Sequence, residues 1–264
     1  MTSSVDSSCV VTGGARGIGR GIAELMVARG HRVVVGDIDG AAAAATAAEI
    51  GAAAGLAHDV RDPDAHHVVA EEASRHGVVT AWFNNAGVGD DGTLAALGDE
   101  QVRRLVEVNL LGTLWGTRAA LAAFGPAGGD VVNVASIAGL GPVPGDSVYA
   151  ATKAAVVSLS ASVHAETPRG VRVHALCPDG ADTAMLAAQD PTGLGAQLVH
   201  SGGAILSVAE VAEAAVSLVG SRRVVRALPT WRGGVVRTSA LAPGVMQHAA
   251  GLFAAQGRRA MRRR

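Results

Sequence analysis

The sequence predicts a single α/β domain built on a doubly wound parallel sheet, and three observations support this fold class. Short apolar runs alternate with helical patterns of ten or more residues, which is the order of βαβ units. A glycine-rich turn follows the first apolar run, where a strand would pass into a helix. The 264 residues contain no linker-like stretch and no internal repeat, and one core can serve a chain of this length.

Four strands and three helices are predicted in the first half of the chain. Apolar runs closed by glycine or a polar residue predict strands at 8–12, 31–36, 55–58 and 78–84. Amphipathic or alanine-rich stretches predict helices at 18–30, 41–50 and 64–76. Asp39 can cap the second of these helices with its side chain.

The second half repeats this alternation, with right-handed crossovers expected between parallel strands. Its predicted strands are residues 130–135, 171–176 and 224–228. Its predicted helices are residues 99–121, 148–167 and 208–219, and the first of them contains Asn109. We assign residues 1–235 to the α/β domain, with a lid-like segment at about 184–207, and residues 236–264 to a C-terminal extension.

The composition argues against several classes of protein. A formal net charge of −1 does not suit a nucleic-acid-binding protein, which would carry a basic surplus. The charge-free runs at 191–209 and 238–257 contain Gly, Pro, Gln and His, so neither predicts a membrane-spanning helix. The two cysteines, Cys9 and Cys177, lie in apolar runs, and no secretory signal is visible. Both observations favour the cytoplasm.

The turn after the first strand has the residue types that bind the pyrophosphate of a dinucleotide. Glycines permit the tight turn and the close approach of backbone N–H groups, and the amino end of the next helix attracts an anion. The residues predicted to contact the cofactor here are Gly13, Arg16, Gly17, Ile18 and Gly19.

Asp37 and the adjacent Ile38 end the second strand, and Asp37 follows Gly17 by 20 residues. A carboxylate at this place accepts hydrogen bonds from the adenosine ribose hydroxyls and repels the 2′-phosphate of NADP. Arg16 favours the opposite preference, because a guanidinium there can meet a 2′-phosphate. We therefore predict NAD as the cofactor, with NADP as the less favoured alternative.

The only lysine, Lys153, follows the only tyrosine, Tyr149, by four residues. On a helix this spacing puts both side chains on one face. A phenol titrates near pH 10, and a neighbouring ammonium together with a positively charged nicotinamide lowers its pKa. Tyr149 can then take a proton from an alcohol or donate one to a carbonyl. Ser136, thirteen residues earlier, can hold the same substrate oxygen.

Six motifs in this order resemble the compact form of the short-chain dehydrogenase/reductase family, which has a Rossmann-like fold, over about residues 5–220. They are Thr12 with Gly13, Gly17, Ile18 and Gly19; Asp59 with Val60; Asn84, Asn85, Ala86 and Gly87; Asn109; Ser136; and Tyr149 with Lys153.

The resemblance implies roles for these residues. It implies that Asp59 and Val60 lie near adenine, and that Asn85, Ala86 and Gly87 follow the adenosine side of the cofactor. It further implies that Lys153 binds the nicotinamide ribose and that Asn109 holds a water in a proton relay from Tyr149. It also implies a homotetramer or homodimer, formed through the helices that carry Tyr149 and residues 208–219.

One departure from the family pattern follows the sixth strand, where Pro-Gly is usual and this chain has Pro178 and Asp179. Pro178 and Thr183 still match the pattern, so backbone contacts to the nicotinamide carboxamide are expected near Ala181. Asp179 puts a carboxylate either near the site or on its solvent rim, and we expect the rim.

The C-terminal extension is predicted to be an amphipathic helix with a basic end. Its apolar positions at helical spacing are Leu241, Val245, Ala249, Leu252 and Phe253, and its arginines are Arg258, Arg259, Arg262, Arg263 and Arg264. The favoured interpretation is a helix packed on its own subunit or on a neighbour. The alternative is an interfacial anchor that makes weak contact with anionic membranes.

These observations predict an NAD-dependent oxidoreductase that interconverts a secondary alcohol and a ketone. Its catalytic residues would be Asn109, Ser136, Tyr149 and Lys153. Mostly apolar or small residues at 138–146 and 184–207 favour an uncharged, hydrophobic small-molecule substrate. No metal is predicted, because the nine histidines form no ligand set.

Three alternatives remain. An NADPH-dependent ketone or 3-ketoacyl reductase is opposed by Asp37. A nucleotide-sugar epimerase would need a longer substrate domain than 264 residues supply. A non-catalytic dinucleotide-binding sensor is opposed by the complete set of catalytic residue types.

Overall fold

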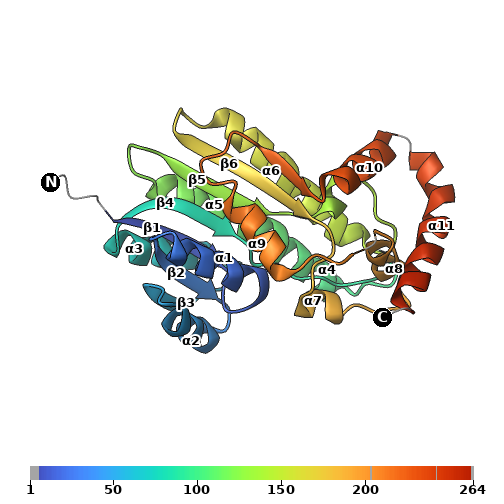
Figure 1. Cartoon of the computed structure of the whole chain (residues 1–264), viewed down its shortest axis with the longest axis horizontal. Helices are drawn as coiled ribbons and strands as arrows, with labels where there is room; N and C mark the ends of the chain where they lie inside the picture. Colours follow the sequence, from blue (N-terminus) through green and yellow to red (C-terminus); the bar gives the residue numbers. More distant parts are fainter. Residues whose placement is uncertain (1–5, 203, 242, 263–264) are drawn as a thin grey trace.

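The computed structural model describes residues 6–202, 204–241 and 243–262 of the chain. Within them, seven parallel strands form one sheet in the order β3-β2-β1-β4-β5-β6-β7 (Figure 1). The strands are β1 (Ser7–Thr12), β2 (Arg32–Asp37), β3 (Ala54–Ala57), β4 (Val78–Asn84), β5 (Gly129–Val134), β6 (Val171–Pro178) and β7 (Val225–Leu228). The chain reverses its direction across the sheet between β1 and β4, so a crevice opens at their carboxyl ends. The predicted doubly wound parallel sheet is confirmed.

Helices cover both faces of the sheet. One face carries α1 (Gly17–Ala28), α2 (Gly40–Ile50) and α9 (Val208–Val216), and the other carries α3 (Pro63–Arg75), α5 (Gly112–Ala123) and α6 (Ser147–Glu166). The side chain of Asp39 accepts a hydrogen bond from the backbone N–H of Ala42, which confirms its predicted capping of α2.

The core lies in two apolar layers, because successive side chains of a strand point to opposite faces of the sheet. In β1, Cys9 and Val11 pack toward α1 and α9, whereas Val10 packs toward α3 and α5. All three are fully buried. A central strand covered on both faces reads as a continuous apolar run, which is why the sequence identified it.

The helix expected at 99–121 is not regular along its length. It consists of α4 (Asp99–Leu105), a π-helical stretch η1 (Val106–Leu111) and α5. Asn109 lies in η1 and is fully buried. Its side chain bonds in both directions with the backbone of Val88, from Val88 N to Oδ1 at 2.8 Å and from Nδ2 to Val88 O at 2.9 Å. The spacing of apolar residues in the sequence does not reveal a π-helical stretch. Such turns often mark functional sites.

Five further helices in the described part of the chain lie beyond the carboxyl ends of the strands. They are η2 (Ile137–Leu140), α7 (Ala184–Ala187), α8 (Leu194–His200), α10 (Thr230–Leu241) and α11 (Pro243–Met261). The predicted lid segment thus contains α7 and α8. The predicted domain boundary at residue 235 falls inside α10, which begins two residues after β7 ends.

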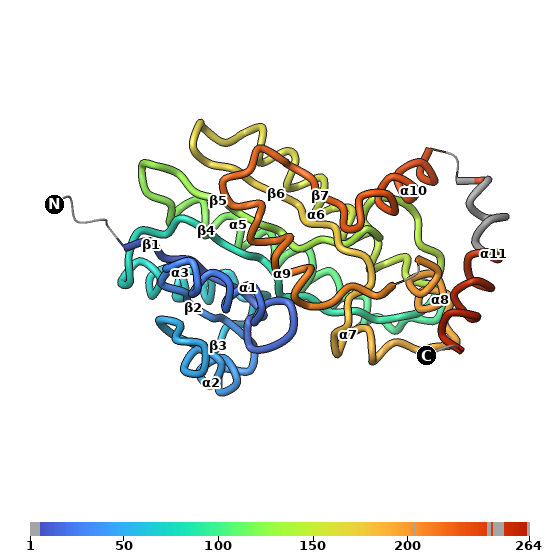
Figure 2. Tube along the Cα trace, in the orientation of Figure 1, coloured from blue at the N-terminus to red at the C-terminus, as the bar shows by residue number. Residues whose placement is uncertain are grey.

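The C-terminal helix α11 packs along α8 of the same chain, at the right-hand end of the view in Figure 2. The contact is close, since a Cβ at Gly257 would lie 1.8 Å from the carbonyl oxygen of Gln197. Arg258 Nη1 donates to Gln197 Oε1 at 2.8 Å. Of the predicted apolar stripe, Leu241 and Leu252 are exposed and Phe253 is half-buried. The side chains of Val245 and Ala249, and all of Arg263 and Arg264, lie outside the described residues.

None of the helices in the described part of the chain combines the length and the hydropathy that a membrane-spanning helix needs.

Candidate active site

A cavity of about 1190 Å³ lies at the carboxyl ends of the strands and runs from the glycine-rich turn to α10 and α11. Of the predicted site residues, those that line it are Gly13, Arg16, Gly17, Ile18, Asp37, Ile38, Asp59, Val60, Asn85, Ala86, Gly87, Ser136, Tyr149, Lys153, Pro178, Ala181 and Thr183. Gly19 and Asn109 do not line it, and both support its wall from behind. The fold therefore brings the predicted residues to one pocket.

The glycine-rich turn between β1 and α1 is braced by the end of β4. Gly13 and Gly17 have φ angles of +61° and +56°, which side chains disfavour. A Cβ at Gly19 would lie 2.1 Å from the carbonyl oxygen of Gly13. Asn85 Nδ2 donates to the carbonyl oxygens of Thr12 and Gly13, both at 3.0 Å. The amino end of α1 thus faces the pocket without a side chain in the way, as a phosphate-binding turn requires.

Asp37 ends β2 beside this turn. Its carboxylate accepts hydrogen bonds from the backbone N–H of Ala15 at 3.1 Å and of Asp39 at 3.2 Å. These two bonds hold it at the mouth of the pocket, where Ile38 is 71% exposed and Arg16 is also exposed. A fixed carboxylate next to an open apolar side chain is suited to a ribose and an adenine ring.

Asp59 has a partner that sequence reasoning did not identify. Arg61 Nη2 lies 2.6 Å from Asp59 Oδ2, and Arg61 also lines the pocket. The hydrogen bonds from Arg61 hold the pKa of Asp59 below its usual range. Val60 between them is buried. The arginine carried no signal in the sequence, because surface arginines are frequent in this chain.

Gly87 separates the side chains of Asn109 and Lys153. A Cβ at Gly87 would lie 3.2 Å from Asn109 Oδ1 and 3.5 Å from Lys153 Nζ. Asn109 Nδ2 also reaches Thr152 Oγ1 on α6 at 3.4 Å. A Cβ at Gly87 would contact both polar groups, and its contact with Asn109 would be tight, so glycine leaves the space between them open.

Tyr149 and Lys153 lie on one face of α6, as the spacing predicts. Lys153 Nζ donates to the carbonyl oxygen of Val134 at 3.0 Å and lies 5.7 Å from the centre of the Tyr149 ring. Ser136 follows the end of β5 by two residues and lines the pocket, where it hydrogen-bonds with Tyr149. Its Oγ also accepts from Ala138 N at 3.1 Å.

Burial dominates the pKa values of this pair. It lowers the pKa of Lys153 to about 8 and raises the pKa of Tyr149 to about 12, with only the hydrogen bond from Ser136 opposing the rise. The sequence predicts that the ammonium of Lys153 lowers the pKa of Tyr149. The groups of the chain alone do not produce this lowering. A phenol with this pKa is a proton donor at neutral pH.

Asp179 does not lie on the solvent rim, so that expectation is wrong. Its side chain is 7% exposed, and its Oδ2 lies 2.5 Å from Nε of Arg232 in α10. Burial raises its pKa, and the charge of Arg232 opposes the rise. Both residues line the pocket. An unpaired carboxylate is costly to bury, but the guanidinium of Arg232 from α10 offsets part of that cost.

The far end of the pocket is more polar than the sequence predicts. Met185, Leu186, Leu198 and Val143 line it as expected. Sequence reasoning missed the apolar residues Trp231, Val235, Val236 and Phe253 and the polar residues Asp90, Arg104, Arg232 and Gln256. Most of these come from segments that the sequence assigned to other roles, so no pattern linked them to the pocket. The polar residues Asp146 and Gln189 lie in the two segments, 138–146 and 184–207, from which it expected an apolar lining.

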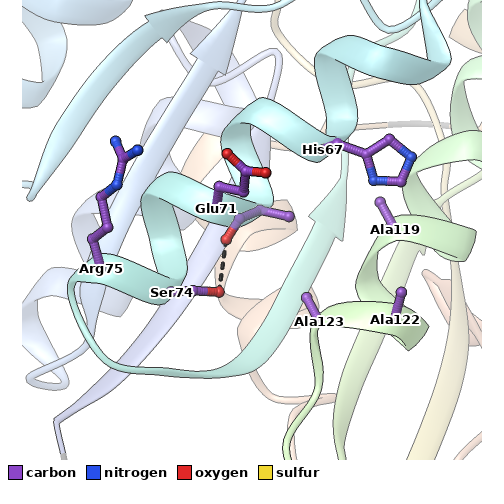
Figure 3. Close-up of a pocket in the computed structure, with 8 residues that line it drawn as sticks. His67, Glu71, Ser74, Arg75, Ala119, Ala122 and Ala123 are labelled. Carbon is purple, nitrogen blue, oxygen red and sulfur yellow. Dashed lines mark hydrogen bonds between the residues drawn. The ribbon is translucent and has the colours of Figure 1, made fainter.

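A second hollow of about 520 Å³ lies between α3 and α5 (Figure 3). His67, Glu71 and Arg75 come from α3, and alanines come from α5. Ser74 Oγ donates to the Ala70 carbonyl of its own helix at 2.9 Å. None of the predicted site residues lies here, so the larger cavity is the candidate site.

The described residues contain no group of three or more His, Cys, Asp or Glu side chains that could hold a metal ion.

A family model described as short chain dehydrogenase matches residues 7–193, more than half of the chain. The chain belongs to the short-chain dehydrogenase family. It is accordingly an NAD(P)-dependent oxidoreductase that acts on CH–OH groups. The resemblance stated from the motifs is confirmed.

This short-chain dehydrogenase is similar to proteins of known activity. It is 41% identical over 180 residues to a sorbitol dehydrogenase of Cereibacter sphaeroides, covering 66% of this chain and 70% of that protein. It is 34% identical over 177 residues to a 3-oxoacyl-[acyl-carrier-protein] reductase of Rattus norvegicus, covering 66% and 75%. A short-chain dehydrogenase/reductase from Burkholderia phymatum, solved in complex with NAD, matches with a TM-score of 0.79 and 26% identity over 90% of this chain and 94% of that chain.

Proposed function

We propose that this short-chain dehydrogenase interconverts a secondary alcohol and a ketone with NAD(H), using Tyr149 as the general acid/base. The observation that carries the proposal is the convergence of Tyr149, Ser136 and Lys153 on one wall of the large pocket. The phenol and the serine hydroxyl can hold one substrate oxygen between them. A group that moves a proton at that oxygen is what alcohol oxidation and ketone reduction require.

The residues proposed to hold the dinucleotide fit it in shape. Glycine at positions 13 and 19 allows the first turn to pack closely on itself and on Ala86, and Asn85 keeps this turn in place. The proposed contacts are Gly13, Arg16, Gly17, Ile18, Gly19, Asp37, Ile38, Asp59, Val60, Asn85, Ala86, Gly87, Tyr149, Lys153, Pro178, Ala181 and Thr183. When bound, the dinucleotide supplies the hydride acceptor or donor.

The preference for NAD over NADP rests on Asp37. Its carboxylate is held by two backbone N–H groups and has no arginine side chain hydrogen-bonded to it among the described residues. A 2′-phosphate would meet this negative charge directly. The NAD-bound relative from Burkholderia phymatum supports the same assignment. Arg16 remains the residue that would favour NADP.

The chain's own residues divide the work of proton transfer. Tyr149 donates its phenolic proton to a carbonyl oxygen in reduction and takes the alcohol proton in oxidation. Ser136 orients the substrate oxygen. Lys153 is fixed near the phenol by the Val134 carbonyl, and its positive charge together with that of a bound nicotinamide would favour the phenolate. Asn109 holds the water through which the proton passes on to solvent.

Two other functions remain as alternatives. An NADPH-dependent ketone or 3-ketoacyl reductase is favoured by the similarity to the reductase of Rattus norvegicus and by the high pKa of Tyr149, which suits proton donation. A non-catalytic sensor would bind the dinucleotide without turnover. Cofactor preference distinguishes the first from our proposal, and turnover distinguishes the second.

Assembly and location are further parts of the proposal. We place the enzyme in the cytoplasm as a homodimer or homotetramer formed through α6 and α9, with at most weak membrane contact through α11. Because α11 packs on α8, removing it would disturb the pocket. Exchange of the exposed Leu241 and Leu252 for serine therefore tests membrane contact better, by co-sedimentation with anionic liposomes. Equal sedimentation of variant and wild type would exclude the contact.

The function is tested by titrating NADH and NADPH against the purified protein and then measuring NAD⁺-dependent oxidation of secondary alcohols. We expect tighter binding of NADH, and turnover that falls by about a thousandfold in Tyr149→Phe while NADH binding is kept. Tighter binding of NADPH would support the reductase alternative. Retained cofactor binding without turnover by the wild type would support the sensor.

A further inference from the structure

Asp146 is a buried carboxylate in the wall of the large pocket, three residues before Tyr149. It is 6% exposed. It occupies the N-cap position of α6, yet its side chain does not cap the helix. No hydrogen bond joins its carboxylate to another residue that the structure describes. A largely buried carboxylate without a partner in the chain is costly, so a hydrogen-bond donor that enters the pocket would stabilise it.

The surrounding backbone is shaped to accommodate this carboxylate. Gly195 in α8 lies directly against it, and a Cβ there would be 2.5 Å from Oδ2 and 2.8 Å from Oδ1. Gly145, which precedes it, has a φ of +90°, and its carbonyl accepts from Gly92 N at 2.8 Å. The lid and the loop after β4 therefore both close around Asp146, and this position requires glycine neighbours.

The local field at Asp146 is negative. Burial and the nearby charge of Asp91 raise its pKa to about 6, so it is mainly ionised at neutral pH. Asp91 also accepts from Asp190 N at 2.7 Å and so links the loop after β4 to the lid. Asp146 and Tyr149 line the same pocket, and the charge of Asp146 adds to the burial that raises the pKa of Tyr149. Arg104, which also lines the pocket, is already paired with Asp90 at 2.6 Å.

We propose that Asp146 is a specificity-determining residue whose carboxylate accepts a hydrogen bond from a second donor group of the substrate, a hydroxyl or an ammonium close to the reacting carbon. The inference rests on the proposed function. A plain apolar alcohol would leave the carboxylate unpaired, whereas a second donor forms a charge-assisted hydrogen bond with it. The preferred substrates are therefore diols, polyols or amino alcohols, which narrows the apolar class that the sequence favours.

The experiment compares 2-butanol, 2,3-butanediol and 3-amino-2-butanol as substrates with NAD⁺. Wild type, Asp146→Asn and Asp146→Leu are measured, with the exposed Asp99→Asn as the matched control for loss of one acid. We expect wild type and control to prefer the diol or the amino alcohol. In Asp146→Leu this preference, measured as the ratio of kcat/KM for each of the two compounds to kcat/KM for 2-butanol, should fall about tenfold or more. Asp146→Asn should lose the preference for the ammonium compound first.

NADH binding, measured by fluorescence, shows whether each variant is folded. An equal fall for all three substrates would assign a merely structural role and overturn the inference. Wild type without a preference, or a preference unchanged in both variants, would also overturn it and leave the proposed function standing. If wild type binds NADH but oxidises none of the three alcohols, the proposed function fails, and the role of Asp146 fails with it.

Discussion

The carboxylate of Asp179 and the guanidinium of Arg232 form an ion pair in the pocket wall, with 2.5 Å between Oδ2 and Nε. The same guanidinium donates from Nη2 to the Leu198 carbonyl at 2.6 Å and to Ser201 Oγ at 3.3 Å. One arginine of α10 therefore joins the end of β6 to the end of α8. The lid is held to the sheet by this junction.

Breaking the junction from one side should destabilise the protein. Arg232→Met leaves Asp179 buried without its cation, and we expect the free energy of unfolding to fall by about 3 kcal/mol. Urea unfolding measures it, with the exposed Arg259→Met on α11 as control. The double variant with Asp179→Asn should recover part of the loss, because no uncompensated charge remains. Equal losses in Arg232→Met and in the control would show that the pair contributes nothing.

Asp37→Asn should change cofactor selectivity. The substitution removes the charge that repels a 2′-phosphate and weakens acceptance from the ribose hydroxyls. We expect the ratio of NADH to NADPH affinity to fall by about tenfold. Fluorescence titration with both cofactors measures the ratio. Arg16→Ala should raise the ratio of NADH to NADPH affinity. The two variants together therefore distinguish the effect of the Asp37 charge from that of the Arg16 charge. An unchanged ratio in Asp37→Asn would contradict the assignment.

Lys153 should make stability rise with pH in the alkaline range. Burial lowers its pKa from 10.5 to about 8, so between these values the unfolded chain binds a proton that the folded protein has released. Stability then increases with pH, by up to about 1.4 kcal/mol per pH unit. Burial raises the pKa of the Cys9 and Cys177 thiols, which acts in the opposite sense above pH 9.

The contribution of Lys153 is isolated by comparison with Lys153→Met, since the cysteines are common to both proteins. Urea unfolding at pH 7.5, 8.5 and 9.5 should show the wild type gaining on the variant at each step. A constant difference would mean that the lysine titrates alike in both states.

The contact of α11 with α8 should be sensitive to one methyl group. Gly257→Ala puts a Cβ where the Gln197 carbonyl lies, so we expect a loss of about 1–3 kcal/mol and a higher KM, because the pocket residues of α11 shift. Gly251→Ala on the same helix is the matched control, since nothing lies within 4 Å of a Cβ there. It should stabilise the helix by up to about 1 kcal/mol. Thermal unfolding distinguishes the two, and similar effects would contradict the packing.

Residues that act through local periodicity were predictable from the sequence. The Tyr149 and Lys153 face of α6, the capping of α2 by Asp39 and the positions of the strands all follow from spacing and side-chain type. The glycine-rich turn was recognised because it lies between a strand and a helix, where phosphate-binding turns are typically rich in glycine.

The π-helical stretch around Asn109 and the partner of Asp59 were not predictable. The first depends on side-chain bonds to Val88 from another segment, and the second on which rotamer Arg61 adopts. Neither leaves a repeating pattern in the chain.

The sequence by itself determined the sheet, the glycine-rich turn and the residues proposed to transfer the proton, because each is set by short-range spacing. Only the tertiary structure decided what surrounds them. It buried Asp179 against Arg232, put Asp146 against Gly195, and laid α11 along α8. These contacts join residues far apart in the chain, and their energies depend on burial and distance, which no local pattern encodes.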